Sequence, residues 1–266
     1  MPQPRVVALY RHPVKGFTPE SCDVLTILHD RVAGDRVFGL RFGDAGEPMS
    51  QVQSDDWWPK QQFVNLMNTP DLARLTLRYD DTTRRLEVSR DGQPLVEVGL
   101  DDVGRARFAE AVAAFVRTLP DAADLDKPGR LPLQLIGDGV TPRYQDRTGG
   151  FVTAHGRASL EALGIALADP ALDERRFRSN VAIEGVEAWA ELGWSGRVRI
   201  CGVEFKAERP VGRCLATQAN PEDGVRDREV LTTLTREIGQ AEPQFAVLLT
   251  PVTEGTIRLG DPVEVG

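Results

Sequence analysis

Apolar and polar residues alternate in short runs through the first half of the chain. The runs predict strands at residues 6–10, 24–28, 36–42, 75–79 and 86–88. The dipeptide Asp91-Gly92 follows the last run and is typical of a two-residue hairpin turn. Several short strands separated by turns at this spacing favour a β-barrel or a β-sandwich.

The second half mixes helical and strand patterns. Apolar residues recur at helical spacing from Phe108 to Leu119, and Pro120 ends this predicted helix. Two further helices are expected at residues 158–167 and 228–238. Strands are predicted at residues 180–184, 197–201, 203–208, 245–249, 256–259 and 263–265. The second and third of these would form a hairpin, and the last two would form a closing hairpin. The predicted fold class is mostly β with some α, an α+β protein.

Residues 120–132 are the best candidate for a linker, because they hold three prolines, a glycine and mixed charge. A chain of 266 residues can form one large domain or two of ordinary size. We predict two domains, at residues 1–125 and 126–266.

Charge and composition narrow the class of function. The formal net charge is −8, and an acidic chain without a basic stripe argues against general nucleic-acid binding. No run approaches the roughly 20 apolar residues of a membrane helix. The first 16 residues lack the apolar core of a signal peptide. The predicted compartment is therefore the cytoplasm, and neither nucleic acid nor membrane is a predicted partner.

Cys214 is the most informative of the three cysteines. It follows Arg213 directly, and a cationic neighbour favours the thiolate form, which is both a nucleophile and a soft metal ligand. A small buried hydrophobe in a strand is the alternative interpretation. Cys22 and Cys201 lie far from it in sequence, so no disulfide framework is predicted.

Common catalytic motifs are absent. The sequence has no G-x-G-x-x-G or Walker loop, no His-Glu-x-x-His and no paired Cys-x-x-Cys. Instead, four separated segments place a cation or polar group beside a tight turn. These segments are residues 11–16, 34–36, 177–180 and 212–214.

In their order and chemistry, these segments resemble the MOSC-domain proteins, named for the C-terminal domain of molybdenum cofactor sulfurase. The chain is more closely similar to the two-part subgroup with an N-terminal β-barrel, which includes the mitochondrial amidoxime reducing component and its bacterial relatives. The motifs that carry the resemblance are His12-Pro13-Val14-Lys15-Gly16, Gly34-Asp35-Arg36, Phe177-Arg178-Ser179-Asn180, Arg213-Cys214 with Thr217, and Gly260-Asp261-Pro262-Val263.

The resemblance implies an N-terminal β-barrel-like domain followed by a MOSC β-barrel domain with peripheral helices. It also implies a molybdenum cofactor, a pterin that carries molybdenum, with Cys214 as catalytic residue and metal ligand. By carry-over, the predicted cofactor-binding residues are Lys15, Arg36, His155, Arg178, Asn180, Arg213 and Thr217. Pyridoxal phosphate binding is a further association of the family.

One departure from the family pattern lies at Gly16, where the family has serine after the lysine. The change removes one hydroxyl from the predicted phosphate site, and backbone amide contact would substitute for it. His155 occupies a place where relatives supply small hydroxyl residues.

The leading hypothesis is a molybdenum-dependent oxidoreductase that reduces small N-hydroxylated compounds. The cofactor would carry out the redox chemistry, and the protein would bind and orient the cofactor and the substrate. Electrons would come from a separate iron–sulfur or flavin protein. A carrier or sensor of persulfide sulfur or of the cofactor, without turnover, stays open, as does a thiol-dependent enzyme without metal.

Overall fold

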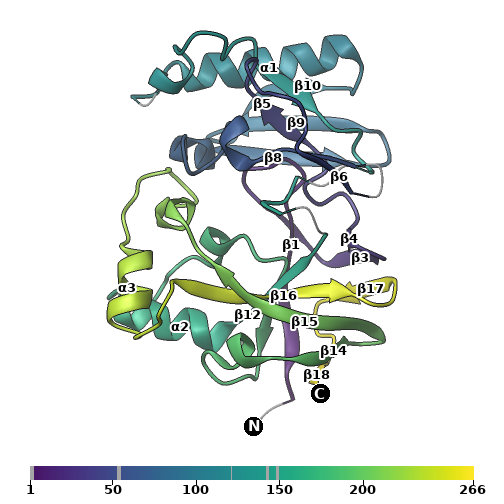
Figure 1. Cartoon of the computed structure of the whole chain (residues 1–266), viewed down its shortest axis with the longest axis vertical. Coiled ribbons are helices and arrows are strands. Elements are labelled where there is room, and N and C mark those ends of the chain that lie inside the picture. Colours follow the sequence, from purple (N-terminus) through teal and green to yellow (C-terminus); the bar gives the residue numbers. More distant parts are fainter. Residues whose placement is uncertain (1–2, 53–54, 121, 142–143, 148–149) are drawn as a thin grey trace.

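The elements that carry the two larger hydrophobic cores lie one above the other along the long axis of the molecule (Figure 1). The first gathers large aromatic side chains, among them Phe17, Phe38 and Phe108. The second gathers mostly aliphatic side chains from a large sheet. The structure is a computed structural model that describes residues 3–52, 55–120, 122–141, 144–147 and 150–266.

Eight strands form the sheet around the second core. In spatial order they are β18 (Val263–Val265), β14 (Gly196–Ile200), β15 (Val203–Gly212), β16 (Gln244–Pro251), β12 (Val152–Gly156), β13 (Val181–Glu184), β1 (Arg5–Arg11) and β2 (Glu20–Cys22). Strands β12 and β13 run parallel, and every other neighbouring pair runs antiparallel.

The start of the chain contributes to this second core. Leu9 of β1 pairs with Val181 of β13, and Leu25 and Ile27 are buried in the same cluster. Figure 1 shows the purple β1 among the strands of the lower half. The predicted domain boundary at residues 125 and 126 stays a prediction, because strands from both sides of it share one sheet.

The first core lies between an antiparallel meander and a helix. The meander consists of β8 (Leu75–Asp80), β9 (Arg85–Arg90) and β10 (Gln93–Val98), and α1 (Asp102–Val116) covers it. Buried and exposed residues alternate strictly along β8, as its sequence pattern predicts. The Gly104 amide donates to the Asp101 carboxylate at 2.6 Å, which caps the helix and starts it earlier than the apolar spacing alone indicates.

Smaller elements connect and cover the two cores. The remaining strands are β3 (Val24–Leu28), β4 (Arg31–Val32), β5 (Gly39–Arg41), β6 (Ser50–Val52), β7 (Asp55–Trp57), β11 (Gln134–Ile136) and β17 (Gly255–Arg258). The remaining helices are α2 (Arg157–Ala166), α3 (Val230–Arg236) and the 3-10 helices η1 (Lys60–Gln62), η2 (Pro70–Arg74), η3 (Ala122–Asp124), η4 (Glu174–Phe177), η5 (Ala190–Gly193) and η6 (Leu215–Gln218). The predicted class, mostly β with some α, is confirmed. No helix in the described residues is long and apolar enough to cross a bilayer.

The strand expected at residues 36–42 is present but shorter, since it is confined to β5; Arg36, with a left-handed φ of 52°, lies outside it. The expected closing hairpin does not form. Strand β17 pairs with β3, more than 220 residues earlier, and β18 pairs with β14.

Candidate functional site

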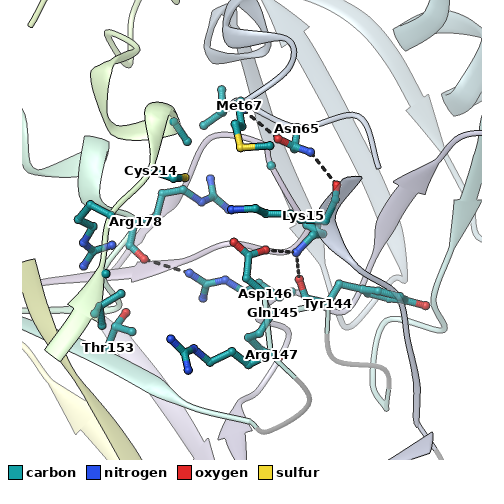
Figure 2. A pocket seen from close by; sticks show the side chains of 18 of the residues that line it. Lys15, Asn65, Met67, Tyr144, Gln145, Asp146, Arg147, Thr153, Arg178 and Cys214 are labelled. Carbon is teal, nitrogen blue, oxygen red and sulfur yellow. Dashed lines mark hydrogen bonds and ion pairs between the residues drawn. The ribbon is translucent and has the colours of Figure 1, made fainter. Parts of the chain in front are cut away.

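A cavity with a volume of about 590 Å³ has a wall to which both halves of the chain contribute (Figure 2). The N-terminal half supplies Lys15, Gly16, Arg36 and residues between 57 and 67. The C-terminal half supplies residues between 144 and 153, 176–178, and residues between 211 and 217. All four segments that place a cation or polar group beside a tight turn therefore reach the cavity, through Lys15 and Gly16, Arg36, Arg178 and Cys214.

Cations outnumber carboxylates on this wall. Among the described residues, the single lining carboxylate is Asp146, and the lining cations are Lys15, Arg36, Lys60, Arg147, Arg176, Arg178 and Arg213. Three of these cations have an ion pair: Lys15 with Asp146, Arg36 with Asp35 and Arg176 with Asp227. On a chain with a net charge of −8, such a concentration creates a local positive potential that suits an anionic ligand.

Cys214 follows the end of β15 and precedes η6, with its side chain half-buried. Its backbone carbonyl accepts hydrogen bonds from the Thr217 amide at 3.0 Å and from the Thr217 hydroxyl at 2.9 Å. Figure 2 shows Cys214 and Lys15 on opposite sides of the cavity. Thr217 therefore holds the turn that carries the thiol, and its own hydroxyl hydrogen is already used.

Arg213 lies in the cavity wall next to Cys214. Its guanidinium donates to the carbonyl of Phe177 at 2.9 Å and to the carbonyl of Phe245, and it lies over both aromatic rings. Burial lowers the pKa of Arg213 to about 9, although the neighbouring Cys214 sulfur acts in the opposite direction. Neutral carbonyls compensate this buried charge only in part, so an anion in the cavity would stabilise it.

Arg36 and Arg178 share an uncommon backbone geometry. Both have φ of 52°, in the left-handed region that side chains rarely adopt. Arg36 donates to the Arg178 carbonyl at 3.0 Å, and Arg178 donates to the carbonyl of Phe17. Burial, followed by repulsion from Arg36, lowers the pKa of Arg178 to about 9. Unfavourable backbone geometry persists where the surrounding structure enforces it, and it clusters at functional sites.

A fully buried carboxylate, Asp35, contacts Arg36 of this pair. It accepts from the His12 amide at 2.7 Å, from the Asn180 side chain at 3.1 Å and from the Arg36 guanidinium, and the His12 ring lies within 3.3 Å. Burial alone would raise the pKa of Asp35, but Arg36 and His12 hold it well below its usual range. The carboxylate is therefore ionised in the folded protein at neutral pH.

Lys15 crosses from the N-terminal half to the 144–147 segment. Its ammonium donates to the Tyr144 carbonyl at 2.9 Å and to the Asp146 carboxylate. Burial lowers the pKa of Lys15, while Asp146 opposes this effect. Gly16 beside it has φ of 79°, and a Cβ atom there would come within 2.6 Å of Asn65. The space of the serine that the family has at this position is thus occupied by Asn65.

His155 and Asn180 do not line the cavity, so the structure does not support the direct contact with a cofactor predicted for them. Both are fully buried. The His155 ring lies 3.3 Å from the Glu174 carboxylate and against Phe245, behind the wall. The Asn180 side chain donates to the Tyr10 carbonyl and to Asp35. Asn180 thus supports the wall through Asp35, which sequence order alone does not reveal.

Comparison with known families decides where this chain belongs. The MOSC N-terminal beta barrel domain matches residues 3–124, and the MOSC domain matches residues 150–264. The chain is a MOSC-domain protein.

Its similarity to curated relatives is modest. It is 37% identical over 116 residues to mitochondrial amidoxime-reducing component 1 of Mus musculus, which covers 40% of this chain and 34% of the relative. With the protein of that name from Xenopus laevis the identity is 35% over 115 residues, covering 40% and 33%. With that from Homo sapiens it is 28% over 184 residues, covering 63% and 53%. The matches thus span between a third and about half of each relative. They give no support to pyridoxal phosphate binding or to a cytoplasmic location.

The sequence did not reveal that residues 144–147 of this MOSC-domain protein lie in the cavity wall. Tyr144, Gln145, Asp146 and Arg147 line it, and their contacts reach Lys15, 129 residues away from Tyr144. The run is polar and belongs to no predicted element, so local periodicity carries no signal. Within the described residues, no three His, Cys, Asp or Glu side chains form a cluster that could hold a metal.

We predict that the protein loses stability as the pH falls from 6.5 to 4.5. Burial, followed by Arg36 and Arg178, lowers the pKa of His12 from 6.5 to about 3, although Asp35 opposes this shift. Between these two pH values the unfolded chain binds the proton and the folded chain does not, so acid favours unfolding. The free energy of unfolding, measured by urea titration, should fall by about 1 kcal/mol per pH unit below pH 6.

Two histidine variants separate this effect from general acid sensitivity. His12→Gln removes the titrating group and should flatten the dependence between pH 6.5 and 4.5. His29→Gln changes an exposed histidine and should leave the wild-type slope unchanged. Equal slopes for the wild type and His12→Gln would contradict the prediction.

Proposed function

We propose that this MOSC-domain protein is a molybdenum-cofactor oxidoreductase that reduces N-hydroxylated compounds. One observation carries the proposal: the half-buried thiol of Cys214 shares a cavity wall with Arg36, Arg178 and Arg213. A thiol and a cluster of cations are the two protein groups that an anionic, metal-bearing cofactor requires. The names of the curated relatives support the same activity class.

The chemistry of the wall fits the cofactor. Cys214 would be the protein ligand to molybdenum, and one thiolate is sufficient because the pterin sulfurs also bind the metal. Arg36, Arg178 and Arg213 would hold the phosphate and the polar pterin, since guanidinium groups form bidentate hydrogen bonds with phosphate. The lowered pKa values of Arg178 and Arg213 indicate cations that lack full compensation and would gain from such an anion.

Lys15 and Thr217 have secondary places in this assignment. Lys15 would add a point charge to the anion site if its ammonium contacted the ligand as well as Asp146, or in place of Asp146. Thr217 would act through the turn that it holds at Cys214. The domain division at residues 1–125 and 126–266 belongs to the same proposal, with the cofactor between the N-terminal and C-terminal contributions to the wall.

The proposed reaction takes two electrons and two protons. The nitrogen–oxygen bond of the substrate breaks. One proton joins the leaving hydroxyl group to form water, and the nitrogen gains one hydrogen from the other proton. When bound, the molybdenum cofactor would supply the two electrons, and a separate iron–sulfur or flavin protein would replenish them. The chain's own residues bind the anionic cofactor, orient the substrate and restrict access of water to the cavity.

A metal measurement coupled to turnover tests the proposal. Protein from a host that makes the cofactor should contain nearly stoichiometric molybdenum and pterin, measured by elemental mass spectrometry and by fluorescence after oxidation. With a chemically reduced dye as donor, it should convert an N-hydroxylated amidine to the amidine. Growth on tungstate should abolish this turnover while leaving the protein folded.

Other results would support a different function. Labile sulfur on Cys214 without molybdenum would favour a sulfur carrier. Full turnover by protein free of molybdenum, lost after alkylation, would favour a thiol-dependent enzyme.

A further inference from the structure

Two cations of the cavity wall, Lys60 and Arg147, have no partner for their charge. Both line the cavity, and no described residue forms a hydrogen bond or an ion pair with the charged end of either side chain. The other lining cations contact a carboxylate or a backbone carbonyl. Unpaired lysine and arginine are ordinary on an open surface, but in a cavity wall they leave charge that a ligand can compensate.

A ligand in the cavity can reach both charged ends. Lys60 and Arg147 are half-buried, and neither has an unpaired side-chain nitrogen that is sealed from solvent. Figure 2 shows Arg147 extending into the cavity without a dashed contact to any other side chain drawn. The two cations are therefore available to a bound molecule, unlike the enclosed polar atoms elsewhere in the wall.

Both cations lie near Asp146, on the solvent side of the cavity. Asp146 has a side chain that is 57% exposed, whereas its partner Lys15 is 6% exposed. Arg147 follows Asp146 directly in the chain. Burial would raise the pKa of Asp146, but Lys15 and, more weakly, Lys60 hold it below its usual range, so the charge of Lys60 acts at this place. Each half of the chain thus supplies one unpaired cation to the outer part of the wall.

We propose that Lys60 and Arg147 bind a carboxylate of the substrate. The Arg147 guanidinium can donate two hydrogen bonds to one carboxylate, and the Lys60 ammonium adds a point charge. Asp146 beside them would repel a doubly charged phosphate about twice as strongly as a carboxylate, which favours the single charge. This inference rests on the proposed function, and it names the substrate class as N-hydroxylated compounds that carry a carboxylate at a second position.

The wall around Lys60 indicates the body of such a substrate. Trp57, Pro59, Leu66 and Met67 line the cavity from the same stretch of chain as Lys60. Ligand sites commonly combine an apolar lining with a few polar groups that fix the orientation of the ligand. An apolar or aromatic body between the N-hydroxylated group and the carboxylate fits this lining.

The experiment compares two N-hydroxylated benzamidines of equal size, one with a carboxylate opposite the amidine group and one with an uncharged carboxamide there. In the molybdenum-loaded wild type with a reduced dye, kcat/KM should be about 30-fold higher for the carboxylate compound, mostly through a lower KM. Lys60→Met and Arg147→Met should each lower this preference about tenfold and leave the carboxamide compound within about twofold of the wild type. Lys206→Met is the control, because Lys206 is 63% exposed outside the cavity, and it should change neither value.

A binding measurement separates this inference from the proposed function. Calorimetric titration of the carboxylate compound without an electron donor should show an affinity about tenfold weaker in Lys60→Met and in Arg147→Met. If the wild type reduces neither compound but this binding still depends on both cations, the proposed function fails and the carboxylate site stands.

Three results would overturn the carboxylate site. The first is equal kcat/KM for the two compounds in the wild type. The second is loss of pterin from either variant, because the cation would then hold the cofactor. The third is an unchanged preference with the dye, together with slower turnover from a protein donor, because Lys60 and Arg147 would then serve the docking of that donor.

Discussion

Replacing Cys214 with alanine should abolish reduction of N-hydroxylated substrates. Among the described lining residues, the thiol of Cys214 is the side chain that can give a metal an anionic sulfur ligand, and the nearby cations can hold an anion but cannot replace that ligand. The expected loss in kcat/KM is on the order of 10³-fold or more, equivalent to about 4 kcal/mol of transition-state stabilisation. Turnover with a chemically reduced dye, together with molybdenum and pterin content, measures it.

Cys201→Ser is the matched control for this loss. Cys201 is exposed in the turn between β14 and β15, outside the cavity, so its replacement should leave metal content and turnover at wild-type values. In Cys214→Ala, molybdenum should decrease more than pterin, because Arg36, Arg178 and Arg213 still hold the phosphate. Full reduction by Cys214→Ala would remove the thiol from the proposed mechanism.

The sequence predicted elements whose determinants are local. Strict alternation in β8 and the Asp91-Gly92 turn depend on neighbouring residues, and both occur as expected. The closing hairpin failed for the opposite reason. A short strand such as β17 carries little information about which edge it pairs with, and its partner β3 lies more than 220 residues away. Local periodicity carries no information about such long-range pairing.

The same distinction between local and long-range determinants applies to the candidate site. Cys214, Arg36 and Arg178 stand in motifs with a recognisable order, and the fold brings all three to one cavity. The part that sequence reasoning missed is the support around them. Asp35 holds Arg36 from below the surface, and Gln145 reaches the wall from a loop without periodic pattern. Burial and pairing, which define these roles, are properties of the folded chain.

The arrangement of these residues explains how an acidic protein maintains a strongly cationic cavity. Arg36 and Arg178 repel each other and lie in an unfavourable backbone region, so other groups must hold them in position. The buried Asp35 is one such group, with His12 and Asn180 completing its hydrogen bonds. Ligand binding would add a second compensating anion from the cavity side. We therefore expect stability and anion binding to be coupled through Asp35.

Asp35→Ala should consequently destabilise the protein by about 3–5 kcal/mol, the usual result of removing one partner from a buried ion pair. The change leaves Arg36 without its carboxylate and leaves the His12 amide and the Asn180 side chain without their acceptor. Urea unfolding measures the loss. Asp35→Asn retains an acceptor for part of this network and should lose less, which keeps the comparison possible if the alanine variant does not fold.

Asp81→Ala is the control in which the carboxylate removed is exposed. Asp81 also pairs with an arginine, at 3.0 Å from Arg11, but its side chain is 56% exposed. Solvent screens such a pair, so this variant should change the free energy of unfolding by less than about 1 kcal/mol. If Asp35→Ala were as mild as Asp81→Ala, the network would not enforce the position of Arg36.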